Sequence, residues 1–345
     1  MKLLIIGPRW VGEWTEGMGR AAEALGHTVA LFFYWSEDVR GLKDMAYRSL
    51  PPVLHKILKF SEQRFKSARD ILMNRRLIIT AREFQPDVII VLKGEIISKA
   101  TLEALRQPKI PIITWWVDDP FRFPDILHHF ELFDMVYLFD KECATNLALQ
   151  LQGVKRVLYL PCACDQTIFY PQSINPSDYP LLNCTIGFVA VYYPERAALL
   201  RQMKDLHVGL WGSGWEVAQE LCELPEGTWR GLRITAVDAA KVYNLAKICP
   251  NIHHSQTRLG GLNTRTFEIL AAGGFELVDN VPGLEEHFDV GREIAAYSSP
   301  AHFLELTDYY LTHPVERSGI IARGYDRVIH DHTYTQRLDT ILANL

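Results

Sequence analysis

The sequence predicts an α/β protein built from two Rossmann-like, doubly wound domains that face a cleft. Three observations favour this fold class. The chain has 345 residues, about the length of two domains of typical size. Short apolar runs alternate with helical patterns along it, and a stretch rich in Pro, Ser and Asn separates two cycles of that alternation.

The first cycle occupies residues 1–170. An apolar run closed by glycine at 2–7 predicts the first strand, and a helical pattern and a second apolar run follow within 19–34. Further strands are predicted within 87–94, 110–119, 134–140 and 156–161. Near-continuous apolar strands separated by helices are typical of a parallel sheet covered on both faces, and we expect a domain of that kind here.

The second cycle follows residues 170–183, which lack periodicity and are the best candidate for a linker. Strands and helices alternate again over 183–325, which predicts a second domain, and residues 326–345 are expected to form a final helix. Ligands of such folds bind outside the carboxyl ends of the strands. We therefore expect the functional site there.

The composition is that of a globular protein. Hydrophobic residues make up 48% of the chain and charged residues 22%, and 36 Lys and Arg stand against 41 Asp and Glu, for a net charge of −5. This balance excludes a protein that coats nucleic acid over its whole surface. No apolar run reaches the roughly 18 residues that cross a bilayer, and the six cysteines form no C-x-x-C pair. We expect a cytoplasmic protein with free thiols.

Six segments occur in the order found in one known family. They are "ALGHTVALF", "WWVDDPF", "GFVAVYYPER", "LWGSGW", "GLNTRTFEILAAGGFELVD" and "HTYTQRL". Through them the chain resembles the CgeB-like (spore maturation protein) glycosyltransferases of the GT-B class. The resemblance implies transfer of a sugar from a nucleotide-activated donor held by the second domain to an acceptor held by the first. It also implies that the final helix packs back on the first domain.

The segment 263–274, "NTRTFEILAAGG", is the most informative for chemistry. A helix capped by Asn263 or Thr264 would offer free N–H groups and the positive end of its dipole to a diphosphate, and Arg265 adds a charge. The resemblance implies that Glu268, one turn further, accepts hydrogen bonds from ribose hydroxyls. The alternative is an ordinary capped amphipathic helix. Related retaining transferases carry a second glutamate eight positions earlier, where this chain has Gly260, and the stereochemistry of transfer therefore stays open.

Four other residues of the second domain are donor-site candidates. Gly212 and Gly214 follow an apolar run, where glycine lets the backbone approach a ligand or turn sharply. Arg196 opens a predicted helix and is a candidate for a bidentate contact to pyrophosphate, with a surface arginine as the alternative. Tyr243 is a candidate for contact with the base, although core packing is the default for such a residue.

Acidic residues of the first domain are the candidates for a catalytic base. Asp118 and Asp119 end a buried apolar strand, where a carboxyl group can acquire the raised pKa that suits a base for the acceptor hydroxyl. The alternative is that the pair caps the next helix. Glu13, in the glycine-rich loop after the first strand, is the second candidate, and an exposed loop acid is its alternative.

No metal or cofactor is expected besides the nucleotide sugar, which is a substrate. GT-B enzymes generally use helix dipoles and basic residues in place of a cation, and the histidines of this chain lack partners at ligand spacing. His253 and His254 follow a predicted strand, which keeps them as minor site candidates.

Residues 40–82 contain eleven Lys or Arg and three Asp or Glu, a local charge of +8. Apolar residues recur beneath the charges at helical spacing, as in solvated amphipathic helices packed on a domain. The alternative is a basic face that contacts anionic lipid headgroups or guides an anionic acceptor. That reading would place the protein at the inner face of the membrane.

The predicted function is a glycosyltransferase that moves a sugar from a nucleoside-diphosphate sugar to an unidentified hydroxyl acceptor, with no nucleic-acid partner. Two alternatives stay open. One is a GT-B-fold sugar-nucleotide epimerase or hydrolase. The other, motivated by Gly260 in place of a glutamate, is a non-catalytic nucleotide-sugar-binding protein in surface-coat assembly.

Overall fold

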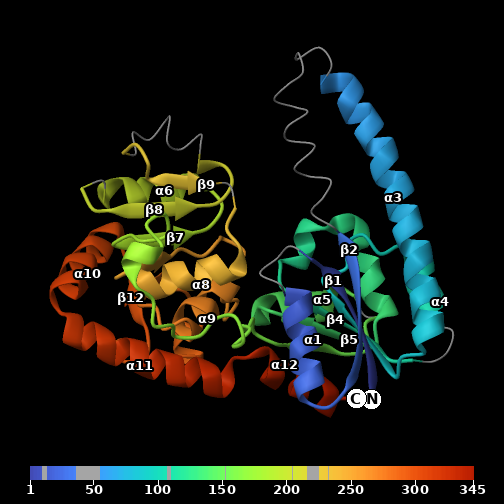
Figure 1. Ribbon diagram of the computed structural model, residues 1–345. Helices are drawn as coiled ribbons and strands as arrows, with labels where there is room; N and C mark the ends of the chain where they lie inside the picture. Colours follow the sequence, from blue (N-terminus) through green and yellow to red (C-terminus); the bar gives the residue numbers. More distant parts are fainter. Residues whose placement is uncertain are drawn as a thin grey trace. The chain divides into compact units, whose positions relative to one another are not determined.

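The computed structural model describes residues 1–9, 14–35, 55–106, 110–151, 153–203, 205–215, 225–231 and 233–345. The side chains of residues 35 and 55–68 are outside this description. The chain divides into two compact units (Figure 1): unit 1 is Met1–Leu160 with Leu338–Leu345, and unit 2 is Pro161–Arg337.

The division between the units falls before the predicted linker at 170–183. The residues after Pro161 pack within unit 2, because Cys164 forms a parallel bridge with Thr333 and the ring of Phe169 stacks on Tyr243, with 6.2 Å between the centroids. The Pro, Ser and Asn content of 170–183 therefore marks a loop on unit 2, where η4 (Pro176–Asp178) lies, and the border of the first domain at residue 170 is corrected to Leu160.

The described part of unit 1 forms a parallel sheet in the order β2-β1-β3-β4-β5-β6. The strands are β1 (Lys2–Pro8), β2 (Thr28–Trp35), β3 (Val88–Leu92), β4 (Ile112–Trp116), β5 (Met135–Leu138) and β6 (Val157–Tyr159). The helices are α1 (Trp14–Ala24), α3 (His55–Phe84), α4 (Lys99–Arg106) and α5 (Lys141–Gln150), with 3-10 segments η2 (Pro120–Arg122) and η3 (Pro124–Leu132). The strand order reverses between β1 and β3, which makes their carboxyl ends the switch point of this sheet.

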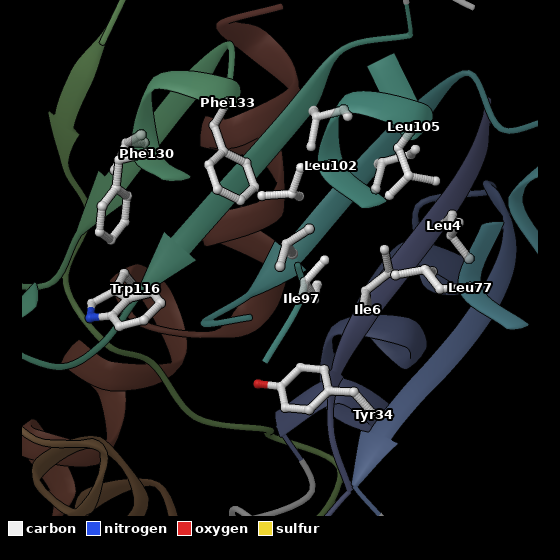
Figure 2. Packing of buried hydrophobic residues seen from close by; sticks show 14 of the residues in the cluster. Leu4, Ile6, Tyr34, Leu77, Ile97, Leu102, Leu105, Trp116, Phe130 and Phe133 are labelled. Carbon is white, nitrogen blue, oxygen red and sulfur yellow. The ribbon is translucent and has the colours of Figure 1, made fainter. Parts of the chain in front are cut away.

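Side chains of β1 alternate between the two faces of the sheet. Leu4 and Ile6 enter one core with residues of the helices on that face (Figure 2), among them Leu77, Leu102 and Phe130. On the opposite face Trp14 of α1 packs edge-on against Trp115, with 5.4 Å between the ring centroids. Each apolar run that predicted a strand contains one. The strands β1, β3, β4 and β5 are buried at almost every position, which requires apolar residues throughout.

The described part of unit 2 contains two parallel sheets, β7-β8-β9 and β10-β11-β12. The strands are β7 (Ile186–Val189), β8 (Val208–Trp211), β9 (Trp229–Gly231), β10 (Cys249–Asn251), β11 (Glu276–Asp279) and β12 (Ala295–Tyr297). A parallel bridge between Ile186 and Ile248 joins them. Across this join the order is β9-β8-β7-β10-β11-β12, which is the Rossmann order and reverses between β7 and β10.

The helices of unit 2 are α6 (Pro194–Leu200), α8 (Ala236–Leu245), α9 (Thr264–Ala271), α10 (Pro300–Thr312) and α11 (Pro314–Asp331), with 3-10 segments η5 (Arg201–Met203) and η6 (Leu284–Glu286). The predicted final helix at 326–345 is two helices, because α11 ends at Asp331 and α12 (Tyr334–Ala343) begins after a break. From Leu338 onward the chain belongs to unit 1.

The chain passes between the units twice, and Arg337 ties the two passages together. Its guanidinium group donates to the carbonyl oxygens of Pro161 (2.8 Å), Cys162 (2.9 Å) and Asp331 (2.9 Å). Its Nη2 also lies 2.7 Å from Nδ1 of His332, and burial and this neighbouring charge lower the pKa of His332 to about 2. A neutral imidazole therefore accepts the hydrogen bond.

Among the described helices, none combines the length and the hydrophobicity that crossing a membrane requires.

Candidate functional site

Polar side chains of unit 2 gather at the switch point between β7 and β10. Val189 ends β7, Asn251 ends β10, and α9 begins at Thr264 beside them. Since crevices at such switch points are where α/β sheets bind ligands, this place is the candidate site of unit 2.

Asn263 caps α9, as the sequence predicted. Its Oδ1 accepts from the backbone N–H of Thr266 at 3.3 Å. The amide also pairs with Asn251, since Asn251 Nδ2 donates to Asn263 Oδ1 (3.1 Å) and Asn263 Nδ2 donates to Asn251 Oδ1 (3.0 Å). This reciprocal pair fixes the first turn of α9 to the end of β10. The N–H groups of Thr264 and Arg265 have no partner within the helix.

Arg265 spans the switch point. Its Nε donates to Asn251 Oδ1 at 3.2 Å, and its Nη1 donates to the carbonyl oxygen of Val189 at 3.3 Å. Burial lowers the pKa of its guanidinium, and four surrounding groups oppose that shift: Tyr243, Glu268, Glu276 and Asp279. No acceptor among the described residues bonds Nη2, which leaves an oriented donor at the helix N-terminus.

Arg196 is a buried neighbour of Arg265. It donates from Nη1 to the carbonyl oxygen of Val191 (2.9 Å) and from Nη2 to that of Ile252 (2.8 Å), and it lies over the ring of Tyr193. Burial and the charge of Arg265 lower its pKa to about 10. The surface-arginine alternative is therefore wrong. Arg196 fixes the loops after β7 and β10, and an anion would relieve the repulsion between the two guanidinium groups.

Glu268 lies one turn along α9 and is 8% exposed. Burial raises the pKa of its carboxyl group to about 7, although Arg265 and the hydroxyl of Thr264 lower it. The fully buried phenol of Tyr243 belongs to the same electrostatic cluster, since its pKa is raised by burial and by Glu268. The ring of Tyr243 packs on Phe169, which favours the core role that the sequence allowed for this residue.

A second buried acid forms a hydrogen bond with the amide pair. Glu276, at the start of β11, accepts from Asn251 Nδ2 at 2.7 Å, and its other oxygen has no hydrogen-bond partner among the described residues. Burial raises its pKa to about 8, while Asn251 and Thr266 lower it. Near neutral pH this side chain is therefore a protonated, uncharged group that orients Asn251.

His253, one of the minor candidates, forms a pair with Asp279. Its Nδ1 lies 2.8 Å from Asp279 Oδ1, and its backbone N–H donates to the same carboxylate. Its buried Nε2 has no partner among the described residues. The contact with Asp279 fixes the orientation of the ring. His254 instead packs on the ring of Tyr193.

The two glycines of "WGSGW" are explained by chain packing. A Cβ on Gly212 would lie 2.0 Å from the carbonyl oxygen of Ala190, and one on Gly214 would lie 2.8 Å from Cβ of Tyr192. Both also have positive φ, +147° and +88°. They let the turn after β8 approach the loop after β7, and a contact with the donor stays a prediction.

In unit 1 the two adjacent aspartates have different surroundings. Asp119 is buried and caps η2, because its Oδ1 accepts from the backbone N–H of Phe121 at 2.9 Å. The capping alternative is therefore the observed role of Asp119. The side chain of Asp118 is 23% exposed, and its Oδ2 lies 2.5 Å from Lys93 Nζ.

Lys93 is the centre of this cluster. It follows β3 with φ of +66°, its Nζ lies 3.5 Å from Glu95 Oε1 and 4.9 Å from the ring centre of Phe123, and its side chain is 20% exposed. Tyr34 closes the cluster, because its hydroxyl donates to the carbonyl oxygen of Leu92 and accepts from the N–H of Gly94. Burial and Glu95 raise the pKa of Tyr34. A lysine, two carboxylates and aromatic rings thus lie at the carboxyl ends of β3 and β4.

Glu13 lies outside the described residues, as do residues 40–54 of the basic segment, and the call on Glu13 stays a prediction. The described part of the chain contains no group of three or more His, Cys, Asp or Glu side chains arranged for a metal ion.

The sequence interpretation missed four residues that organise these clusters, namely Asn251, Asp279, Glu276 and Lys93. Three of them carried the signal that identified Asp118, a polar residue at the carboxyl end of an apolar strand. Glu276 lies at the start of its strand, and only its burial in the fold identifies it as part of the site.

Residues 196–343 match the family model described as glycosyl transferase-like. The spore protein CgeB of Bacillus subtilis (strain 168) is 25% identical over 271 residues, which cover 73% of this chain and 81% of that protein. These matches confirm the resemblance to the CgeB-like glycosyltransferases.

Solved structures share the fold over the whole chain. HepE of Anabaena, in complex with UDP and glucose, matches with a TM-score of 0.66 and 12% identity, and the match covers 100% of both chains. Sucrose-phosphate synthase of Thermosynechococcus elongatus matches with a TM-score of 0.63 and 12% identity, covering 100% of this chain and 98% of that one. The two-Rossmann GT-B fold class predicted from the sequence is confirmed.

Proposed function

We propose that this CgeB-like glycosyltransferase of the GT-B fold is a cytoplasmic enzyme that transfers a sugar from a nucleoside-diphosphate donor to a hydroxyl acceptor. The observation that carries the proposal is Arg265. Its side chain is held by Val189 and Asn251 at the switch point of unit 2, and no described residue accepts a hydrogen bond from its Nη2 at the N-terminus of α9. HepE, with the same fold, is known in complex with UDP and glucose.

The diphosphate would bind where positive charge is already concentrated. The N–H groups of Thr264 and Arg265, the dipole of α9 and the Arg265 guanidinium converge there, and Arg196 adds a second positive charge nearby. As the sugar–phosphate bond breaks, negative charge grows on the leaving diphosphate. Fixed donors of this kind stabilise that charge without reorganisation.

Glu268 would accept hydrogen bonds from the ribose hydroxyls. Its pKa of about 7 in the unliganded protein means that it is only partly ionised at neutral pH. A hydroxyl donor favours the ionised form. Donor affinity should therefore rise with pH as the pH passes through 7. Gly212 and Gly214, in the neighbouring turn, stay candidates for lining the nucleotide.

Asp118 is our candidate for the base that accepts the proton of the acceptor hydroxyl. It is partly exposed and lies at the strand ends of unit 1, whereas Asp119 is occupied by its cap. Lys93 lies beside it, with its Nζ 2.5 Å from Asp118 Oδ2. Its neighbours Glu95 and Phe123 offer the acceptor and stacking groups that sugar hydroxyls and rings use.

We also propose that transfer needs no metal ion, because Arg265, Arg196 and the α9 N-terminus supply the positive charge that a cation would otherwise provide. Treatment with a chelator should leave the rate of sugar transfer unchanged. A loss that Mg²⁺ or Mn²⁺ restores would overturn this part of the proposal.

Thermal unfolding with UDP-, GDP-, CMP- and dTDP-sugars tests the donor site, with UDP-glucose as the first probe. A donor at a hundred times its Kd should stabilise the fold by about 2.7 kcal/mol. Arg265→Ala should abolish the shift, and Arg292→Ala, whose side chain is 72% exposed, should not. The proposal fails if no nucleotide sugar raises the melting temperature of the wild type. It also fails if the donor raises the melting temperature of Arg265→Ala as much as that of Arg292→Ala.

Product analysis separates the proposal from the alternatives. Donor turnover in the absence of any acceptor would favour the epimerase or hydrolase. Donor binding with no turnover in a broad acceptor screen would favour the non-catalytic binding protein. Asp118→Asn should lower the rate of transfer by at least about a hundredfold and leave the donor-induced thermal shift unchanged.

A further inference from the structure

The outer face of α3 exposes large apolar side chains. Ile71, Leu72 and Ile79 are 55%, 60% and 52% exposed. They follow a helical spacing that places them on one side of the helix, with the exposed Arg75 and Arg76 between them. Aliphatic side chains left in water at this density are characteristic of an interaction surface.

The inner face of α3 accounts for its packing on unit 1. Met73, Leu77 and Ala81 are buried in the core shared with β1 and β3. Figure 2 shows Leu77 in this core. Asn74, on the same face, donates to the carbonyl oxygen of Ile96 and accepts from the N–H of Ser98. The outer face is therefore not needed to hold α3 on the unit, and its apolar residues have a different purpose.

The charge of α3 identifies the kind of partner. The helix contains eight Lys or Arg and three Asp or Glu, although the chain as a whole carries −5. In the described part of α3, Arg75 and Arg76 lie between the apolar side chains, and Arg69 and Arg82 are also exposed on this helix. Aliphatic residues mixed with arginines on one helix face match an anionic bilayer, where the apolar groups enter the headgroup boundary and the guanidinium groups bind phosphates.

We propose that the outer face of α3 docks unit 1 on an anionic phospholipid membrane, with Ile71, Leu72 and Ile79 inserted and Arg75 and Arg76 on lipid phosphates. The helix spans 30 residues and is drawn with its label in Figure 1. This docking surface is separate from the donor cluster of unit 2 and does not depend on the proposed transfer reaction.

Flotation of the full chain with vesicles tests the proposal. Vesicles of phosphatidylcholine alone are compared with vesicles that contain phosphatidylglycerol, at low and at high salt. Binding should require phosphatidylglycerol and weaken as salt rises, because the arginine contacts are screened. Failure to bind phosphatidylglycerol vesicles at low salt overturns the proposal.

Two pairs of variants locate the surface. Arg75→Glu with Arg76→Glu should weaken binding at least about 25-fold, since each arginine contributes about fivefold near an anionic surface. Its control is Lys99→Glu with Lys155→Glu, an equal charge change at side chains of unit 1 that are 65% and 59% exposed. Ile71→Asn with Leu72→Asn should also release the chain, whereas Leu149→Asn, 72% exposed on α5, should not.

Each contrary outcome identifies another occupant. Equal loss in the α3 variants and their controls would mean that the net charge alone drives binding, and it would overturn the assignment to α3. Dimers in solution that Ile71→Asn with Leu72→Asn dissociates in the absence of lipid would assign the face to a second copy of the chain. Circular dichroism of the variants separates these results from a loss of folding.

Discussion

At the residue scale, two buried glutamates of unit 2 have raised pKa values. Glu268 and Glu276 flank Arg265 from α9 and β11, and burial raises the pKa of the first to about 7 and of the second to about 8. Each therefore binds a proton in the folded protein at a pH where it would be ionised in the unfolded chain. Folding stability must fall as the pH rises through these values.

Glu268→Gln should remove part of this pH dependence. The stabilising contribution of protonated Glu268 is complete below its ordinary pKa and is lost as the pH rises through about 7. Between pH 4 and pH 8 the wild type should lose up to about 3 kcal/mol relative to the variant. Urea unfolding across that range measures the difference. Parallel curves for the two proteins would contradict the burial of this carboxyl group, and Glu285→Gln, an exposed acid, is the control.

Prediction at the residue scale succeeded where residue type and position both carried information. Asn263 was predicted as a helix cap from its residue type and position, and the structure confirms the cap. The donor-binding roles of Arg265 and Glu268 stay predictions. Lys93 and Asn251 were missed although each lies at the carboxyl end of an apolar strand, because their partners, Asp118 and Asn263, lie on other elements that only the fold brings close.

At the element scale, the position of α9 depends on the amide pair of Asn251 and Asn263. The cap requires only an oxygen acceptor at position 263, whereas the pair also requires the Nδ2 donor. An asparagine satisfies both, which explains why a serine or an aspartate, equally good as caps, would not serve.

Asn263→Ser and Asn263→Asp should separate the cap from the pair. Both keep a capping oxygen and lose the donor to Asn251, so each should lower the unfolding free energy by about 1 kcal/mol. Asn263→Asp also places a negative charge beside the diphosphate and should weaken donor binding well beyond Asn263→Ser. Urea unfolding and calorimetric titration with the donor measure the two effects. Equal donor affinity in both variants would contradict the placement of the diphosphate at the N-terminus of α9.

The turn after β8 provides a test of close packing. Gly212→Ala would bring a Cβ to 2.0 Å from the carbonyl oxygen of Ala190 and should cost at least about 2 kcal/mol. Gly227 also has a positive φ, +77°, but no described atom lies within 4 Å of its Cβ position. Gly227→Ala should therefore cost about 1 kcal/mol, the backbone penalty alone. Similar costs in urea unfolding would contradict the close approach.

On the scale of the whole molecule, the strands and the two-domain division were predictable from the sequence, and the border between the units was not. Buried parallel strands are recognisable in the sequence as apolar runs between helices. The border at Leu160 has no compositional signal, because buried apolar side chains continue across it, among them Cys164 and Phe169. The Pro-rich stretch at 170–183 is the stronger signal in the sequence and marks a surface loop.

Removal of Leu338–Leu345 should destabilise unit 1 rather than unit 2. Leu338 and Ile341 are fully buried, and Arg156 donates to Asn344 at 2.7 Å and 2.9 Å. Two buried aliphatic side chains contribute several kcal/mol. Calorimetry of the shortened chain should show the unfolding transition of unit 1 at a lower temperature. The transition of unit 2 should still be stabilised by the donor. A chain shortened only by the half-exposed Leu345 is the control, and an unchanged profile would contradict the assignment of this segment.

The double passage of the chain between the units also governs the order in which they can fold. A ribosome releases Met1–Leu160 first, but the buried side chains that complete this unit lie after Arg337. Unit 2 is a continuous stretch of sequence and can close as soon as it emerges, whereas unit 1 must wait with part of its apolar surface uncovered. In this protein the half that is synthesised first is therefore the half that finishes folding last.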